Sequence, residues 1–251
     1  YQYFCEKYKH DLNNIFNDVL TRGAFILQRD LDEFEAQISE YLGVKHAIGV
    51  GNCTDGLQLA LMAAGVKAGD EVIFPSHTFV ATAGAIKSIG ASPVPIECGY
   101  DHLMDTRQIE SNISERTKAI LPVQLNGRTC DMDTLKEIAS RHGLLIIEDA
   151  AQSFGAKYKG VKTGTFGLAA AFSFYPAKVL PCLGDGGCVV TNSDDIAREV
   201  RFLRNHGRNE DGSIAKWGIN SRLDNLQAAF LKFFLSIYDE FIEKRRHIAT
   251  I

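Results

Sequence analysis

The chain has 251 residues, of which 45% are hydrophobic and 23% charged, which is the composition of a soluble globular protein with a core of ordinary size. Its formal net charge of −4 argues against a nucleic-acid-binding surface. No apolar run reaches the roughly 18 residues of a membrane helix, and the first residues form neither a signal peptide nor a transit peptide. The six cysteines show no zinc-type spacing, so we expect reduced thiols, no structural metal and a cytoplasmic protein.

Hydrophobic spacing predicts the helices and strands in chain order. Two helices come first, over 6–20 and 30–42. Strands and helices then alternate, and the strands are almost continuously apolar, as is typical of strands buried on both faces. This pattern predicts a three-layer α/β/α domain with a mostly parallel, seven-stranded sheet. The expected strands are 46–50, 71–74, 92–96, 118–123, 144–148, 169–174 and 188–191, and the helices among them are 54–64, 82–89, 132–142 and 196–205.

The last part of the sequence predicts a long amphipathic helix after a polar loop at 206–220. An apolar stripe that includes Leu223, Phe230 and Phe241 runs along this helix, which continues to Ile251 without a cap. We expect the stripe to be exposed and to need a further surface to pack on. The predicted organisation is therefore a large domain at 1–220 and a helix at 221–251 that leads to an absent C-terminal small domain.

Two charged side chains follow buried strands of this predicted sheet. Asp149 comes directly after one strand, and Lys178 stands a few residues beyond another. The carboxyl ends of strands in an open α/β sheet form the edge where ligands bind. An amine there can form a Schiff base with an aldehyde cofactor, and a carboxylate can keep a pyridine nitrogen protonated. The pair indicates pyridoxal phosphate chemistry; the alternatives are a surface lysine after Pro176 and an Asp149 that caps a turn.

Two more segments add to this interpretation. Residues 49–56 lie between a strand and a helix N-terminus, where free backbone N–H groups favour a phosphate, although by itself a helix cap at Asn52 or Thr54 explains them better. Phe79 could stack on a flat ring, and a core phenylalanine is an equally good explanation. A dinucleotide site fits the glycine spacing poorly, and a Walker loop is excluded because no Gly-Lys-Ser/Thr is present.

Five motifs occur in order along the chain: 52–57 (Asn-Cys-Thr-Asp-Gly-Leu), 75–82 (Pro-Ser-His-Thr-Phe-Val-Ala-Thr), 148–152 (Glu-Asp-Ala-Ala-Gln), 173–178 (Ser-Phe-Tyr-Pro-Ala-Lys) and 218–223 (Gly-Ile-Asn-Ser-Arg-Leu). In these motifs the chain resembles the DegT/StrS-type aminotransferases, which have the large domain of fold type I pyridoxal phosphate enzymes and act on nucleotide-linked keto sugars. The resemblance covers essentially the whole chain. It implies pyridoxal phosphate as cofactor, pyridoxamine phosphate as its intermediate form, glutamate or glutamine as amino donor and a keto sugar nucleotide as acceptor.

The same resemblance implies a role for each residue of the site. Lys178 would bind the cofactor aldehyde and then move the proton between the amino-acid carbon and the cofactor. Asn220 would reach the phosphate bound in the neighbouring subunit, so the resemblance implies a homodimer with composite active sites. The other implied contacts are Asp149 with the pyridine nitrogen, Gln152 with the ring hydroxyl, Phe79 with the ring face, and Cys53, Thr54 and Ser173 with the phosphate.

Some residues depart from the family pattern, and other activities remain as alternatives. Cys53 stands where the family often has glycine, and 123–127 reads Val-Gln-Leu-Asn-Gly instead of Val-His-X-Tyr-Gly. Related sugar dehydratases have histidine in place of the lysine, so Lys178 argues against dehydration. A cyclitol or aminobenzoate-forming relative stays open, while the intact Lys178, Asp149 and Gln152 speak against a non-catalytic relative. Without the small domain, we expect these residues alone to turn over poorly.

Overall fold

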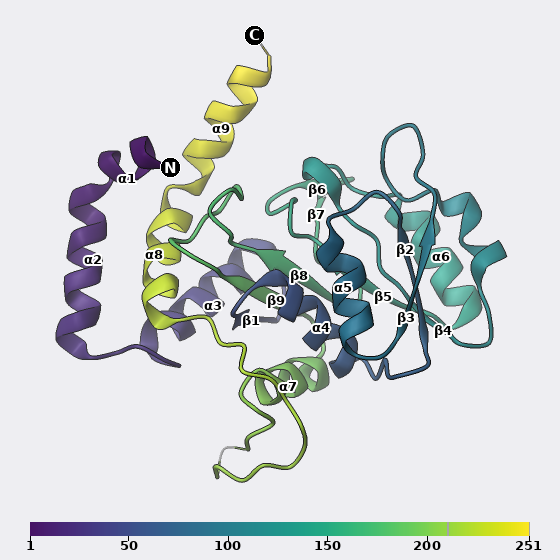
Figure 1. Ribbon diagram of the computed structural model, residues 1–251. Coiled ribbons are helices and arrows are strands. Elements are labelled where there is room, and N and C mark those ends of the chain that lie inside the picture. Colours follow the sequence, from purple (N-terminus) through teal and green to yellow (C-terminus); the bar gives the residue numbers. More distant parts are fainter. Residues whose placement is uncertain (210, 251) are drawn as a thin grey trace.

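The computed structural model describes residues 1–209 and 211–250, which build helices on both faces of one central sheet (Figure 1). The strand order of that sheet is β1-β9-β8-β5-β4-β2-β3. From β8 to β3 neighbouring strands run parallel, and β9 runs antiparallel to both β8 and β1. The predicted seven-stranded, mostly parallel sheet is confirmed. Its strands are β1 (His46–Val50), β2 (Glu71–Pro75), β3 (Ser92–Ile96), β4 (Thr117–Ile120), β5 (Leu145–Asp149), β8 (Ala169–Ser173) and β9 (Gly187–Thr191).

Alternating residues of the central strands bury themselves in two separate cores. Ala171 and Val189 belong to the core under α4, α5 and α7, whereas Phe172 and Val190 belong to the core under α3 and α8. The chain moves in opposite directions along the sheet through α5 and through α6, so right-handed crossovers place these two helices on opposite faces (Figure 1). The helices are α3 (Arg29–Leu42), α4 (Cys53–Ala63), α5 (Val80–Ser88), α6 (Met132–His142), α7 (Asp194–Leu203) and α8 (Asn225–Ser236).

Both ends of the chain differ from the sequence expectation. The first helix is divided at Tyr8 into α1 (Gln2–Lys7) and α2 (Lys9–Arg22). The single long helix predicted after residue 220 is wrong: α8 ends before Ile237, whose φ of −112° and ψ of 9° leave the helical region, and α9 (Tyr238–Ala249) follows. The apolar periodicity runs unbroken through this point, so it gives no sign of the break. Ile251 and one residue of the 206–220 loop, Glu210, lie outside the described residues.

The apolar stripe of the C-terminal segment is covered by the chain itself, completely at Leu223 and Phe230 and in part at Phe241. Leu223 and Phe230 are buried in the core that α8 shares with α2 and α3.

The structure also has a hairpin formed by β6 (Lys157–Tyr158) and β7 (Val161–Lys162). The sequence did not predict this hairpin, because strands of two residues carry no periodicity. None of the helices in the described ranges combines the length and apolar character needed to cross a bilayer.

Close backbone packing fixes where the site will form. The start of β9 lies against the start of α4, and a Cβ on Gly187 would stand 2.6 Å from the carbonyl carbon of Asn52 and 2.7 Å from the backbone nitrogen of Cys53. Both neighbours are backbone atoms, so a side chain at this position would push α4 away from the sheet. Glycine at 187 therefore lets the N-terminus of α4 reach the edge where β5 and β8 end.

Candidate active site

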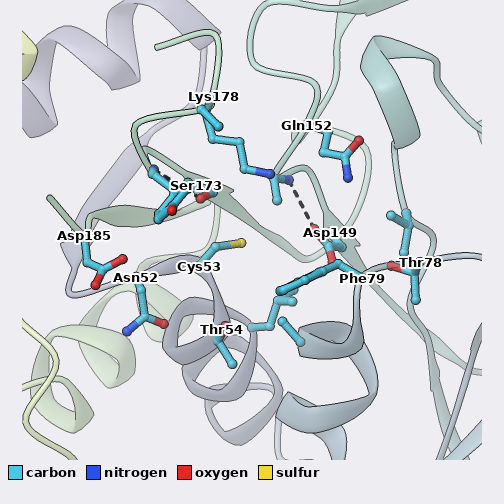
Figure 2. Close-up of a pocket in the computed structure, with 16 residues that line it drawn as sticks. Asn52, Cys53, Thr54, Thr78, Phe79, Asp149, Gln152, Ser173, Lys178 and Asp185 are labelled. Atoms are coloured by element: carbon cyan, nitrogen blue, oxygen red, sulfur yellow. Dashed lines mark hydrogen bonds between the residues drawn. The ribbon is translucent and has the colours of Figure 1, made fainter. Parts of the chain in front are cut away.

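A cavity of about 520 Å³ opens at the carboxyl edge of β5 and β8, between the N-terminal ends of α4 and α5. Seven of the eight site residues predicted from the sequence line it, and they reach it from four separate segments of the chain. Figure 2 shows Lys178 descending into the pocket on the side of Asp149, with Asn52, Cys53 and Ser173 at the opposite end. The seven are Cys53, Thr54, Phe79, Asp149, Gln152, Ser173 and Lys178.

The N-terminus of α4 forms one end of the cavity. Asn52 caps this helix, because its Oδ1 accepts a hydrogen bond of 2.9 Å from the N–H of Asp55. The cap leaves the N–H groups of Cys53 and Thr54 for another acceptor, and Ser173 faces the same space. Free N–H groups and the positive end of the helix dipole favour a phosphate. The capping and phosphate-binding interpretations of this segment are therefore compatible.

Asp149 lies at the floor of the cavity and is 6% exposed. Its Oδ2 accepts a hydrogen bond of 2.7 Å from Thr82 Oγ1, and its Oδ1 accepts one of 3.1 Å from the N–H of Ala151. Burial raises the pKa of this carboxyl, while the hydrogen bonds from Thr82 and Ala151 and the charge of Lys178 lower it. The carboxylate is therefore held in place by donors on both oxygens.

Lys178 is half-buried and is the one basic side chain among the described residues that line the cavity. Its position comes from a tight turn, since the N–H of Lys178 donates to the carbonyl of Tyr175 over 2.8 Å with Pro176 inside the turn. The loop is closed at its base, where the N–H of Cys182 donates to the carbonyl of Phe174. This geometry carries the amine from the end of β8 back over Asp149.

Gln152 is oriented by the segment that departs from the family pattern. The N–H of Asn126, a residue with a φ of +53°, donates to Gln152 Oε1 over 3.0 Å. Because this bond occupies Oε1, the amide NH₂ of Gln152 is left to face the cavity. Gln124, which stands where the family has histidine, is fully buried and donates from Nε2 to Glu148 Oε2 over 2.9 Å. Gln124 therefore has a structural place behind the site.

Glu148 anchors a loop to the strand that carries Asp149. It is fully buried, and besides Gln124 three backbone N–H groups donate to its carboxylate, from Gly164 (3.0 Å), Phe166 (2.8 Å) and Gly167 (3.0 Å). Burial raises the pKa of Glu148, and these donors oppose that rise. Glu148 does not line the cavity, and these four bonds satisfy its carboxylate. Its role is to hold the 164–167 loop against the strand that carries Asp149.

Phe79 and Cys53 complete the walls of the cavity. Phe79 occupies the N-cap position of α5 and is 71% exposed. Such exposure is unusual for a large aromatic side chain and leaves its ring face available to a ligand. Cys53 is buried, and burial raises the pKa of its thiol well above the usual range. The thiol is therefore protonated, and its sulfur adds no charge beside the N-terminus of α4.

The eighth predicted residue, Asn220, does not line this cavity. It is exposed, and its backbone pairs with Asn205 across the 206–220 loop. Three residues that sequence reasoning missed are Thr78 and Asp185, which line the cavity, and Thr82, which holds Asp149. The sequence Gly-Asp-Gly-Gly at 184–187 is typical of a turn, but it does not reveal that Asp185 faces the site.

Comparison with known proteins places this geometry in a family. The model of the DegT/DnrJ/EryC1/StrS aminotransferase family matches residues 6–251. A dTDP-3-amino-3,4,6-trideoxy-alpha-D-glucose transaminase from Streptomyces venezuelae is 47% identical over 92% of this chain, which spans 62% of that relative. A pleiotropic regulatory protein from Geobacillus stearothermophilus is 44% identical over 98% of this chain and 66% of its own length.

A solved structure agrees with the sequence comparison. The crystal structure of S. venezuelae DesV in complex with a ketimine intermediate superposes with a TM-score of 0.92 and 45% identity, covering 95% of this chain and 65% of that one. The chain thus spans a little under two thirds of these relatives. The fold, the lysine and carboxylate pair and the family match agree, and the chain belongs to the DegT/DnrJ/EryC1/StrS aminotransferase family.

Proposed function

We propose that this chain carries the cofactor-binding domain of a pyridoxal phosphate-dependent aminotransferase that delivers an amino group to a nucleotide-linked keto sugar. The observation that carries the proposal is one cavity in which the amine of Lys178 and the buried carboxylate of Asp149 lie opposite the N-terminus of α4. These three groups match the three polar ends of the cofactor: its aldehyde, its pyridine nitrogen and its phosphate.

The donor groups of the cavity fit that cofactor one by one. The phosphate would take the free N–H groups of Cys53 and Thr54 and the hydroxyl of Ser173. The ring would lie against Phe79, with Asp149 at the pyridine nitrogen and the amide NH₂ of Gln152 at the ring hydroxyl. Apolar side chains such as Val123 and Leu57 line the rest of the cavity, as suits a flat aromatic ring.

Asp149 and Lys178 have different roles in the proposed amino transfer. When bound, pyridoxal phosphate supplies an electron-accepting protonated ring. Asp149 would keep the pyridine nitrogen protonated, because its buried carboxylate, held by Thr82 and Ala151, would lie beside that nitrogen. Lys178, once its nitrogen is free, is placed to take the proton from the substrate carbon as a general base and to return it at the adjacent position. Burial of Asp149 would strengthen its electrostatic interaction with a bound ring.

The substrates belong to the same proposal. The activity in the name of the S. venezuelae relative supports a nucleotide-linked keto-deoxyhexose as acceptor in amino-sugar biosynthesis. From the family resemblance we propose glutamate or glutamine as donor and the cytoplasm as location. We further propose a homodimer with composite active sites, in which Asn220 reaches the site of the partner subunit. Asn220 is exposed outside its own cavity, and Trp217 nearby is 92% exposed, so both are available to a second copy.

The alternatives are less well supported. A dehydratase or a cyclitol aminotransferase would use the same cavity, and the dehydratases of this family carry histidine where Lys178 stands. The name of the Geobacillus relative suggests a regulatory role, and a relative without catalysis is the corresponding alternative for this chain. A chain without turnover has no need to keep a buried Asp149 beneath a lysine amine, so the geometry favours the enzyme.

A half-reaction tests the proposal. The intact protein, loaded with pyridoxal phosphate, is mixed with L-glutamate or L-glutamine in the absence of any acceptor, and the keto acid formed is measured. We expect one equivalent of keto acid per bound cofactor, with loss of the visible absorbance of the aldehyde form. Subsequent addition of a dTDP-linked keto sugar is expected to restore that absorbance. A holoprotein that releases no keto acid with either donor would refute the aminotransferase.

A further inference from the structure

A chain of two threonine hydroxyls connects the cavity with the buried carboxylate. Thr78, which lines the cavity, lies with its Oγ1 2.8 Å from Oγ1 of Thr82. Thr82 is fully buried in the first turn of α5 and donates to Asp149 Oδ2 over 2.7 Å. Figure 2 shows Thr78 at the edge of the pocket beside Asp149. Thr78 directly precedes the N-cap residue Phe79, and Thr82 lies in the first turn of α5, so the start of the helix brings their hydroxyls together.

The direction of this chain of hydrogen bonds follows from the number of protons available. An ionised carboxylate can only accept, so the single hydroxyl hydrogen of Thr82 goes to Asp149. Thr82 Oγ1 then accepts the hydrogen of Thr78. The second oxygen of Asp149 is held by the N–H of Ala151. The hydrogen bonds from Thr82 and Ala151 both stabilise a negative charge on Asp149.

We propose that Thr82 is a positioning residue that keeps the Asp149 carboxylate ionised and aimed into the cavity, and so decides whether the pyridine nitrogen of the cofactor stays protonated. This inference rests on the proposed function. Thr82 does not line the cavity, so it can affect a bound ligand only through its two hydrogen-bonded neighbours, Asp149 and Thr78.

The balance of forces at Asp149 gives Thr82 this influence. Burial is the largest effect on the carboxyl and favours its neutral form, and the Thr82 hydroxyl is the strongest opposing contribution. Without that hydroxyl, Asp149 keeps the Ala151 N–H as its remaining protein donor among the described residues. A neutral Asp149 would offer the ring nitrogen a hydrogen bond without the negative charge that holds a proton there.

The test compares three variants of the intact holoprotein. Thr82→Val keeps the shape and removes the hydroxyl, Thr82→Ser keeps the hydroxyl, and Thr82→Ala removes it by a second route in case valine disturbs folding. Pyridoxal phosphate labelled with ¹⁵N in its ring is bound to each, and the ¹⁵N chemical shift reports ring protonation. We expect the wild type and Thr82→Ser to show a protonated ring, and the valine and alanine variants to shift toward the unprotonated value.

The rate of donor half-reaction is the second readout. We expect kcat/KM to fall about 10- to 100-fold in Thr82→Val, the effect of losing a hydrogen bond to a charged group, with Thr82→Ser close to the wild type. A protonated ring and wild-type rate in both hydroxyl-free variants would overturn the role of Thr82 while leaving the proposed function intact. A wild-type protein that binds no pyridoxal phosphate would instead overturn the proposed function, and this inference with it.

Discussion

Replacing Lys178 by alanine is expected to lower the rate of the proposed amino transfer by about 10²–10⁴-fold, the contribution typical of a general acid or base. Lys178 is the one basic side chain among the described residues lining the cavity, so no neighbour can take over the proton transfer. In the proposed function the contacts with the cofactor phosphate and ring come from other residues, and we therefore expect the variant to bind pyridoxal phosphate without the covalent bond. Steady-state kinetics and a cofactor titration measure the two effects separately.

A matched control and a chemical rescue sharpen this prediction. Lys157→Ala removes an exposed lysine of the β6 strand and is expected to keep the wild-type rate. Added alkylamines are expected to restore part of the activity of Lys178→Ala, because a free amine can enter the space of the lost side chain. A Lys178→Ala protein that transfers amino groups at half the wild-type rate or more would contradict the assigned role.

The second large effect concerns stability and arises from a buried ion pair. Arg204 Nη1 lies 2.6 Å from Glu35 Oε1, and the two side chains are 8% and 11% exposed. The N–H of Gly49 in β1 donates to Glu35 Oε1, and Arg204 Nη1 donates to the carbonyl of Gly49. The ion pair therefore links α3 and the end of α7 to β1. Glu35→Ala leaves the guanidinium buried without its partner, and we expect the free energy of unfolding to fall by about 3–5 kcal/mol. Denaturant unfolding measures this loss.

An exposed pair provides the comparison. Arg198 and Asp195 lie 2.6 Å apart on the surface of α7, with 76% and 82% of their side chains exposed. Arg198→Ala is therefore expected to cost less than about 1 kcal/mol. If Glu35→Ala and Arg198→Ala lowered the free energy of unfolding equally, burial of the Glu35 pair could not be the reason for its contribution.

Much of the fold and of the site could be predicted because both depend on the ends of strands. The apolar strands around residues 147 and 171 are nearly continuous in sequence, and the polar residues directly after them mark one edge of a parallel sheet. Asp149 and Lys178 could be brought together by this rule alone. Cys53 and Thr54 followed from the position of a helix N-terminus after a strand.

The features of the site that could not be predicted depend on contacts between segments that lie far apart in the sequence. The Thr82 bond to Asp149 requires the exact docking of α5 over β5, and 67 residues separate the two partners. The Asn126-Gly127 pair is typical of a turn, and both residues have left-handed backbone, but the pair does not reveal that the N–H of Asn126 orients Gln152. The break at Ile237 interrupts a periodicity that continues on both sides, so local pattern favours one helix where packing gives two.

The most direct measurement is reduction of the holoprotein with borohydride, followed by peptide mass spectrometry. Borohydride fixes an imine between an amine and the cofactor aldehyde, and therefore it records which nitrogen held the cofactor. The account predicts one cofactor per chain, attached to the peptide that contains Lys178, and no attachment in Lys178→Ala. Cofactor fixed to another lysine, or tightly bound cofactor that borohydride leaves unattached in the wild type, would contradict it.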